Sequence, residues 1–262
     1  MRINGSKCFA FKIPLLEGLC EGVDENFSNR DILNELMRKS LFVIFVLMMS
    51  LRPLFAGEKP LCIAALGDST TAGTPGFRSP VEAPPRGAGN EKSQYTYWIG
   101  QKHTDWNILN RGVNGERTDQ IFQRIERDVI GEGADIAIVL AGVNDLYQGF
   151  SAEMVKTGLA RIYAALKEAG VRVVACTILP YNTAGDDVNG RMLEVNSWIA
   201  EYARGEGFGF CDTHSLAADP RRPGKLAGTP DGLHPDIATY RRMGQEISRS
   251  LEDLLQPADK KP

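Results

Sequence analysis

Apolar runs of strand length alternate with longer stretches of helical periodicity along most of this chain. Five runs rich in Ile, Leu, Val and Ala are bounded by turn residues, and this pattern predicts strands. The runs are Leu61–Leu66, Trp106–Asn110, Ala134–Leu140, Val171–Leu179 and Gly207–Cys211. Apolar runs without a polar alternation are typical of strands that are buried on both faces.

Amphipathic stretches between these runs predict the helices. In Asp119–Ile130 the apolar side chains fall on one stripe, and Thr118 is placed to cap the helix start. Ser151 is placed to cap the next helix, and Gly170 is placed to end it. The other predicted helices are Gln94–Lys102, Val188–Arg204 and Asp236–Leu255.

The alternation of strand and helix predicts an α/β fold, because right-handed crossovers build a parallel sheet covered on both faces. Five strands fit a three-layer α/β/α sandwich with a five-stranded parallel sheet, flavodoxin-like in arrangement. We expect a single domain over residues 57–262. A stretch rich in Pro and Gly, residues 74–93, predicts a long loop after the first strand.

The N-terminal part has a different pattern. Met37-Arg38-Lys39 precedes a short apolar run, and a plausible cleavage point follows Ala56. A membrane-spanning helix needs about 20 apolar residues, and this run is shorter. We therefore expect an export signal at residues 37–56 and a periplasmic or secreted protein. Residues 1–36 are then a doubtful extension, either upstream of a true start at Met37 or cytoplasmic and attached to a signal anchor.

Composition narrows the function classes. The 262 residues carry a formal net charge of -3, without the basic surplus that is typical of nucleic-acid binding. Cys62, Cys176 and Cys211 lie in apolar runs, and their spacing fits neither a disulfide framework nor a zinc site. Buried thiols are the simpler interpretation. A Cys176–Cys211 bridge stays open for an oxidising compartment.

Polar motifs follow the first three predicted strands and precede the last predicted helix. They read Gly67-Asp68-Ser69, Asn110–Gly115, Gly142–Asp145 and Asp231–Pro235. The carboxyl ends of parallel strands share one edge of a sheet, so the first three motifs should converge there. The fourth lies in the connection after the last strand, at the same edge.

These motifs contain the groups that acyl transfer needs. The Ser69 hydroxyl becomes a good nucleophile when a base takes its proton, and His234 is the candidate base. Asp231 precedes His234 by three residues, close enough in a turn to orient the imidazole. The backbone N–H groups of Ser69 and Gly115 and the Asn144 side-chain amide suit an oxyanion hole. Each motif alone is also typical of an ordinary turn or cap, but their joint order favours a hydrolase.

The four motifs resemble the sequence blocks of the SGNH hydrolase superfamily, the GDSL-type esterases and lipases. The family glycine of the second block matches Gly115, the asparagine of the third matches Asn144, and the Asp-x-x-His of the last matches Asp231 and His234. Thr70 stands where the family often has leucine. The resemblance spans most of residues 61–245 and implies a flavodoxin-like fold, a serine hydrolase mechanism, ester or thioester substrates, and no metal or other cofactor.

The expected function is an exported serine esterase acting on small-molecule, glycan or lipid esters, with no nucleic-acid partner and no stable membrane span after signal cleavage. One alternative is an O-acetylesterase or acyltransferase acting on envelope glycans, with long loops shaping the cleft. Another is a non-catalytic binding module that retains the fold. A flavin-binding relative is disfavoured, because the loop after the first strand lacks an evident phosphate cradle.

Overall fold

A computed structural model describes residues 34, 37–42 and 59–256 of the chain. The internal contacts divide the chain into two units, Met1–Lys59 and Pro60–Pro262. The second unit contains every strand and helix that carries a label below.

In the first unit, residues 34 and 37–42 are helical. Most of the predicted export signal at 37–56, and most of the extension at 1–36, lies outside the described residues. Among the helices that the structure describes, none is both long and apolar enough to cross a membrane. The export signal and the domain boundary at residue 57 therefore stay predictions.

Five parallel strands form the central sheet of the second unit, in the order β4-β1-β5-β6-β7. The strands are β1 (Cys62–Gly67), β4 (Asn107–Gly112), β5 (Ile136–Leu140), β6 (Arg172–Cys176) and β7 (Gly209–Cys211). Counted along the chain, this order is second, first, third, fourth and fifth, which is the flavodoxin-like arrangement. The predicted fold class is confirmed, and β1 lies between β4 and β5.

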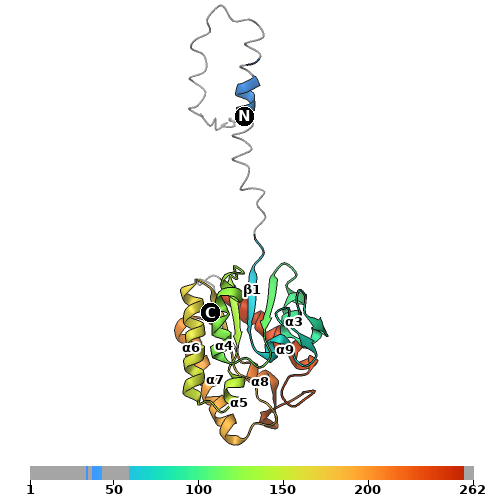
Figure 1. Ribbon diagram of the computed structural model, residues 1–262, viewed down its shortest axis with the longest axis vertical. Coiled ribbons are helices and arrows are strands. Elements are labelled where there is room, and N and C mark those ends of the chain that lie inside the picture. Colours follow the sequence, from blue (N-terminus) through green and yellow to red (C-terminus); the bar gives the residue numbers. More distant parts are fainter. Residues whose placement is uncertain (1–33, 35–36, 43–58, 257–262) are drawn as a thin grey trace, which may run out of the picture. The chain divides into compact units, whose positions relative to one another are not determined.

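Helices cover both faces of the sheet (Figure 1). One face carries α3 (Tyr95–Lys102) and α9 (Ile237–Leu255). The other carries α4 (Thr118–Gln123), α6 (Ala152–Glu168) and α7 (Asp186–Glu206).

The alternation of side chains along β1 feeds one apolar core on each face. Ala64 and Leu66 belong to the core under α4, α6 and α7, whereas Ile63 and Ala65 belong to the core under α3 and α9. All six residues of β1 are buried, as predicted for a strand covered on both faces.

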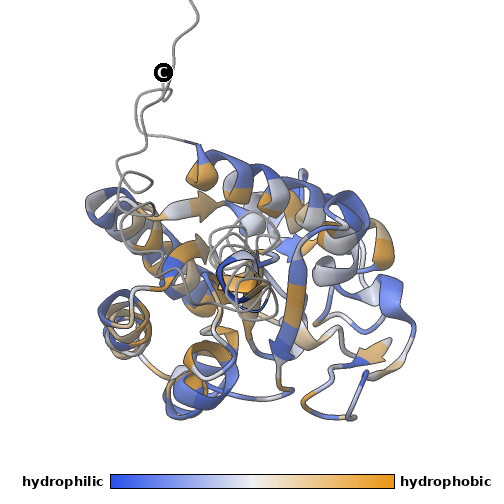
Figure 2. Ribbon diagram, turned by 90° about the horizontal axis from the view of Figure 1, so that it is seen from above, coloured by the Kyte–Doolittle hydropathy of each residue, from blue (hydrophilic) through white to orange (hydrophobic). Residues whose placement is uncertain are grey.

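Local signals place the ends of the long helices. Ser151 accepts a hydrogen bond from Met154 N–H at the start of α6, and Gly170 follows its end with a φ of 75°. Asp236 caps α9 by accepting from Thr239 N–H. Apolar positions recur along one side of α9 (Figure 2), and they include fully buried residues at helical spacing.

Short elements occupy the connections. They are α2 (Ser69–Ala72), β2 (Phe77–Arg78), β3 (Ala88–Gly89), η2 (Glu91–Ser93), η3 (Glu126–Ile130), α5 (Val143–Tyr147), α8 (Thr213–Ala217), β8 (Ala218–Asp219) and β9 (Arg222–Leu226). The predicted long loop at 74–93 thus contains a two-stranded antiparallel sheet, β2-β3, and a 3₁₀ turn.

Two predicted elements differ most from those observed. The helix predicted over Asp119–Ile130 is divided into α4 and the π-helical turn η3, and the division lies at Arg124, whose guanidinium turns inward to the sheet edge. The strand predicted over Val171–Leu179 ends at Cys176. The next residue, Thr177, still donates its N–H to the carbonyl of Cys211, and its hydroxyl donates to Asp212 Oδ1.

Cys176 and Cys211 are register partners on β6 and β7, and both thiols are free and buried. The bridge that the sequence left open is not formed.

Candidate active site

Ser69 stands at the junction between β1 and the short helix α2. Asp68 caps this helix, because its Oδ1 accepts a hydrogen bond of 2.9 Å from Thr70 N–H. A Cβ atom at Gly67 would lie 2.3 Å from the carbonyl oxygen of Leu140, so the glycine permits the close approach of β5. The chain therefore turns sharply after β1 and presents Ser69 at the carboxyl edge of the sheet.

An unbroken line of hydrogen bonds joins Ser69, His234 and Asp231. The Ser69 Oγ lies 2.9 Å from His234 Nε2, and His234 Nδ1 lies 2.6 Å from Asp231 Oδ2. The other carboxylate oxygen, Oδ1, accepts bonds of 2.9 Å from the backbone N–H groups of Leu233 and His234. The structure thus brings these three predicted residues together.

The Asp231–His234 segment forms a tight turn, as the three-residue spacing of these residues predicted. Gly232 has a φ of 80°, a conformation that favours glycine, and its N–H donates to the Thr229 hydroxyl. Partial burial by itself raises the pKa of Asp231. The hydrogen bonds from the His234 ring and from the two backbone N–H groups outweigh this effect and hold that pKa below its usual range.

The loop that contains Gly115 lies directly beside α2. Val113 N–H donates to the carbonyl of Gly67, and a Cβ at Gly112 would lie 2.1 Å from the backbone nitrogen of Ala72. Gly115 has a φ of 79°, which favours glycine at this turn. The end of β4 is therefore pressed against the helix that begins with Ser69.

Asn144 is held next to Gly115 by a bond to the backbone. Its Nδ2 donates to the carbonyl oxygen of Glu116 over 2.9 Å. An amide NH₂ group has two hydrogens, so this bond leaves the second one available to another acceptor. The next residue, Asp145, caps α4 by accepting from the N–H and hydroxyl of Thr118, which is the first helical residue rather than the predicted cap.

Two buried carboxyls lie close to these groups. Burial raises the pKa of Asp68 to about 7, against the hydrogen bonds from Thr70 and the charge of Arg124, which lower it. Burial also raises the pKa of Asp145 above its usual range, against the bonds from Thr118. Across the described residues, no group of three or more His, Cys, Asp or Glu side chains is arranged to hold a metal ion.

This arrangement is suited to nucleophilic chemistry at a carbonyl carbon. An imidazole within hydrogen-bonding distance of a hydroxyl can accept its proton, and a carboxylate on the far nitrogen fixes the tautomer. Backbone and amide N–H groups beside the hydroxyl can stabilise negative charge on an oxygen.

Sequence reasoning did not identify Arg124 or Glu116 at this site. The Arg124 side chain is 7 % exposed, and its Nε donates to Glu116 Oε2 over 2.6 Å. Arg124 and Asp128 have the i, i+4 spacing of an ordinary surface ion pair, yet both are buried. One signal in the sequence could have indicated this burial. The charged residues Arg124 and Asp128 lie in the same helical stretch as Ile121 and Ile125, which are core residues.

Comparisons with known proteins show the family and the fold of the chain. The sequence profile of the GDSL-like lipase/acylhydrolase family matches residues 65–242. No curated protein matches the chain at a significant level.

Several solved structures share the fold. A GDSL-like lipase from Bacteroides thetaiotaomicron is 18% identical, with a TM-score of 0.62, 76% of this chain covered and 91% of that chain. A lipase/acylhydrolase from Enterococcus faecalis is 20% identical, with a TM-score of 0.57 and coverage of 77% and 100%. An acetyl xylan esterase from Geobacillus stearothermophilus is 18% identical, with a TM-score of 0.56 and coverage of 73% and 94%.

The buried Asp68 carboxyl predicts a pH-dependent stability. Its pKa is about 7 in the folded chain, against the ordinary aspartate value of 3.8, so between about pH 4 and pH 7 the folded state binds a proton that the unfolded chain has released. The free energy of unfolding therefore falls as the pH rises through this window. Asp68→Asn keeps an oxygen acceptor for Thr70 N–H but does not titrate.

Thermal unfolding gives the melting temperature of Asp68→Asn minus that of the wild-type protein. We expect this difference to be larger at pH 8 than at pH 5. Asp135→Asn is the matched control, because Asp135 is an exposed residue whose Oδ2 accepts from Cys62 N–H at the opposite end of β1. A difference between Asp68→Asn and wild type that stays constant with pH would contradict a buried, titrating carboxyl.

Proposed function

The chain belongs to the GDSL-like lipase/acylhydrolase family and is an ester-hydrolysing enzyme, and from this premise we propose that it cleaves carboxylic esters or thioesters with Ser69, His234 and Asp231. The observation that carries the proposal is the line of hydrogen bonds of 2.9 Å and 2.6 Å that joins these three side chains. Family membership also favours an enzyme over the non-catalytic binding module.

In the proposed reaction, Ser69 Oγ attacks the ester carbonyl carbon while its proton moves to His234 Nε2. The bond between that carbon and the alcohol oxygen then breaks, and Nε2 returns the proton to the leaving alcohol. Water, deprotonated by the same nitrogen, then attacks the acyl carbon; the bond to Ser69 Oγ breaks, and Nε2 returns the proton to Oγ as the acid leaves. Asp231 orients the imidazole and stabilises its charged form throughout.

Negative charge develops on the carbonyl oxygen during both attacks, and it needs donors that are already in place. We assign this role to the N–H groups of Ser69 and Gly115 and to the second amide hydrogen of Asn144. The bond from Asn144 Nδ2 to the Glu116 carbonyl supports the assignment, because it holds the amide beside Gly115 before any substrate binds.

A second candidate function is removal or transfer of an acetyl or other acyl group on a sugar hydroxyl of an envelope glycan. The similarity to the acetyl xylan esterase from Geobacillus stearothermophilus supports it, over 94% of that chain. Product analysis with acetylated oligosaccharides and simple aryl esters separates the two candidates. Higher kcat/KM on simple esters, with no turnover of the oligosaccharides, would eliminate the glycan candidate.

We also propose that the chain is exported, on the pattern of residues 37–56. Charged residues precede a short apolar run there, as in an export signal. Mass spectrometry of the protein recovered from outside the cytoplasm should find an N-terminus near residue 57. Peptides from residues 1–36 in that fraction would contradict cleavage of the signal.

The variant Ser69→Ala tests the nucleophile. It should lose nearly all hydrolysis of a short-chain aryl ester, by a factor on the order of a thousand or more in kcat, because among the described residues no other hydroxyl is bonded to His234. The melting temperature should change little, since the change removes one oxygen atom from a nearly buried side chain. Full activity in this variant would refute the assignment of Ser69.

A further inference from the structure

We propose that the Arg124–Glu116 ion pair is a positioning device for the oxyanion-binding groups, acting through the backbone of the Gly115 loop and through Asn144. This inference rests on the proposed role of Asn144. Neither Arg124 nor Glu116 needs to contact substrate for this purpose. Both residues position groups that are proposed to contact it, the Gly115 N–H and the Asn144 amide.

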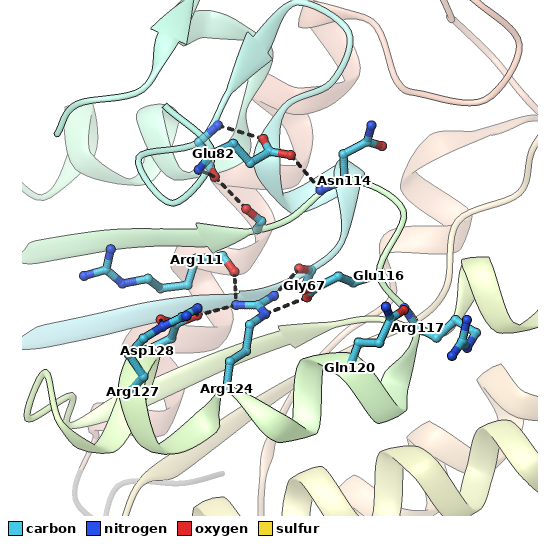
Figure 3. A network of polar contacts seen from close by, with 12 residues as sticks. Gly67, Glu82, Arg111, Asn114, Glu116, Arg117, Gln120, Arg124, Arg127 and Asp128 are labelled. Atoms are coloured by element: carbon cyan, nitrogen blue, oxygen red, sulfur yellow. Dashed lines mark hydrogen bonds and ion pairs between the residues drawn. The ribbon is translucent and has the colours of Figure 1, made fainter. Parts of the chain in front are cut away.

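The Arg124 guanidinium is buried among acceptors at the carboxyl edge of the sheet (Figure 3). Its Nη2 donates to the carbonyl of Gly67 over 2.8 Å, and its Nη1 donates to the carbonyl of Arg111 over 2.6 Å. Its Nε donates to Glu116 Oε2 over 2.6 Å. Asp128 Oδ2 lies 2.7 Å from Nη1 and adds a second carboxylate.

The acceptors of Arg124 belong to the segments that carry the proposed site. Gly67 stands two residues before Ser69, at the end of β1. Arg111 is the penultimate residue of β4, whose loop leads to Gly115. Glu116 directly follows Gly115. One rigid, planar group therefore fixes the nucleophile segment and both ends of the Gly115 loop relative to one another.

Glu116 connects this arrangement to Asn144. The side chain of Glu116 accepts from Arg124, while its own carbonyl oxygen accepts from Asn144 Nδ2 over 2.9 Å. Rotation of the Glu116 peptide would therefore move the Gly115 loop and the Asn144 amide together. An oxyanion hole depends on donors that do not have to reorganise when charge develops, so this restraint bears directly on turnover.

The Glu82 carboxylate restrains the Gly115 loop from its other side (Figure 3). Glu82 Oε1 accepts from Asn114 N–H over 2.8 Å, and Glu82 Oε2 accepts from Ser79 N–H over 3.1 Å. The peptide that leads into Gly115 is thus held by Glu82, and the residue that follows Gly115 is held by Arg124.

Glu116 contributes more than charge balance. The single charge of Asp128 is shared between Arg124 and the exposed Arg127, whose Nε lies 2.6 Å from Asp128 Oδ1, so the Glu116 carboxylate completes the neutralisation of the buried guanidinium. The bond to Glu116 has a distinct consequence, because Glu116 directly follows Gly115 and its own carbonyl oxygen is the acceptor for Asn144 Nδ2.

A double-mutant cycle tests the proposal. The enzyme is assayed on a short-chain aryl ester as wild type, Glu116→Ala, Asn144→Ala and the double variant. Loss of the ion pair should lower kcat by about tenfold or more and leave KM within about threefold, because the affected groups act on the transition state. If Glu116 acts through Asn144, adding Glu116→Ala to Asn144→Ala should cost less than threefold, that is, the two effects should not multiply.

Two further variants serve as controls. Glu116→Gln keeps an oxygen acceptor for Arg124 Nε and should restore kcat to within about threefold of wild type. Glu132→Ala removes a neighbouring carboxylate that is bonded to Arg111 Nη2 over 2.7 Å, outside the Gly115 loop, and should leave kcat unchanged. Thermal unfolding of each variant confirms that the comparison is made on folded protein.

The outcomes separate this inference from the proposed function. If Asn144→Ala is slow but Glu116→Ala is as fast as wild type, the positioning role is wrong and the oxyanion role of Asn144 stands. If the two losses multiply, Glu116 does not act through Asn144 and that part of the proposal is refuted. If Glu116→Gln is as slow as Glu116→Ala, the hydrogen bond from Arg124 does not fix the loop and the proposal fails. If Asn144→Ala itself retains full kcat, the oxyanion assignment is refuted and the inference with it.

Discussion

The hydrogen bond between Ser69 Oγ and His234 Nε2 is the interaction on which the proposed function of this molecule depends. It joins side chains that are 165 residues apart in the chain, over 2.9 Å. No local turn can bring such residues together, so their contact depends on the fold of the whole sheet. β1 delivers Ser69 to its carboxyl edge, and the connection from β9 to α9 returns over the same edge with Asp231 and His234. Any sequence change that shifts β1 or α9 should therefore act on this bond.

The strand order explains why the remaining groups lie around Ser69. β1 pairs with β4 on one side and with β5 on the other, and the loops after these two strands carry Gly115 and Asn144. Three adjacent strands thus deliver the hydroxyl and its flanking donors, while Arg124 bonds to backbone carbonyls on two of them. Buried charge is concentrated here because the functional loops need fixed polar partners where the sheet ladder ends.

Features of the fold and the site that depend on side-chain patterns could be predicted from the sequence, whereas those that depend on bonds to the backbone could not. The five strands and the long helices have strong apolar periodicity, and Ser151 and Gly170 are capping residues of unambiguous chemistry, so the ends of these elements were predicted to within three residues. The positions of Ser69, Asp231 and His234 followed from motifs at strand ends. The burial of Arg124 and Asp128 did not, because their i, i+4 spacing is the same as that of an exposed pair. The acceptors that bury them, at Gly67 and Arg111, are backbone carbonyls that no side-chain pattern records. The division of the predicted helix at 119–130 has the same origin.

The central claim is that Ser69 is activated by His234 across the sheet edge. The most direct measurement is labelling of the intact protein with a serine-directed fluorophosphonate, followed by mass spectrometric identification of the modified residue. The account predicts one stoichiometric adduct on Ser69 in wild type and labelling slowed on the order of a hundredfold or more in His234→Ala, because the base that activates the hydroxyl is gone. An adduct on another residue, or equally fast labelling of Ser69 in His234→Ala, would contradict it.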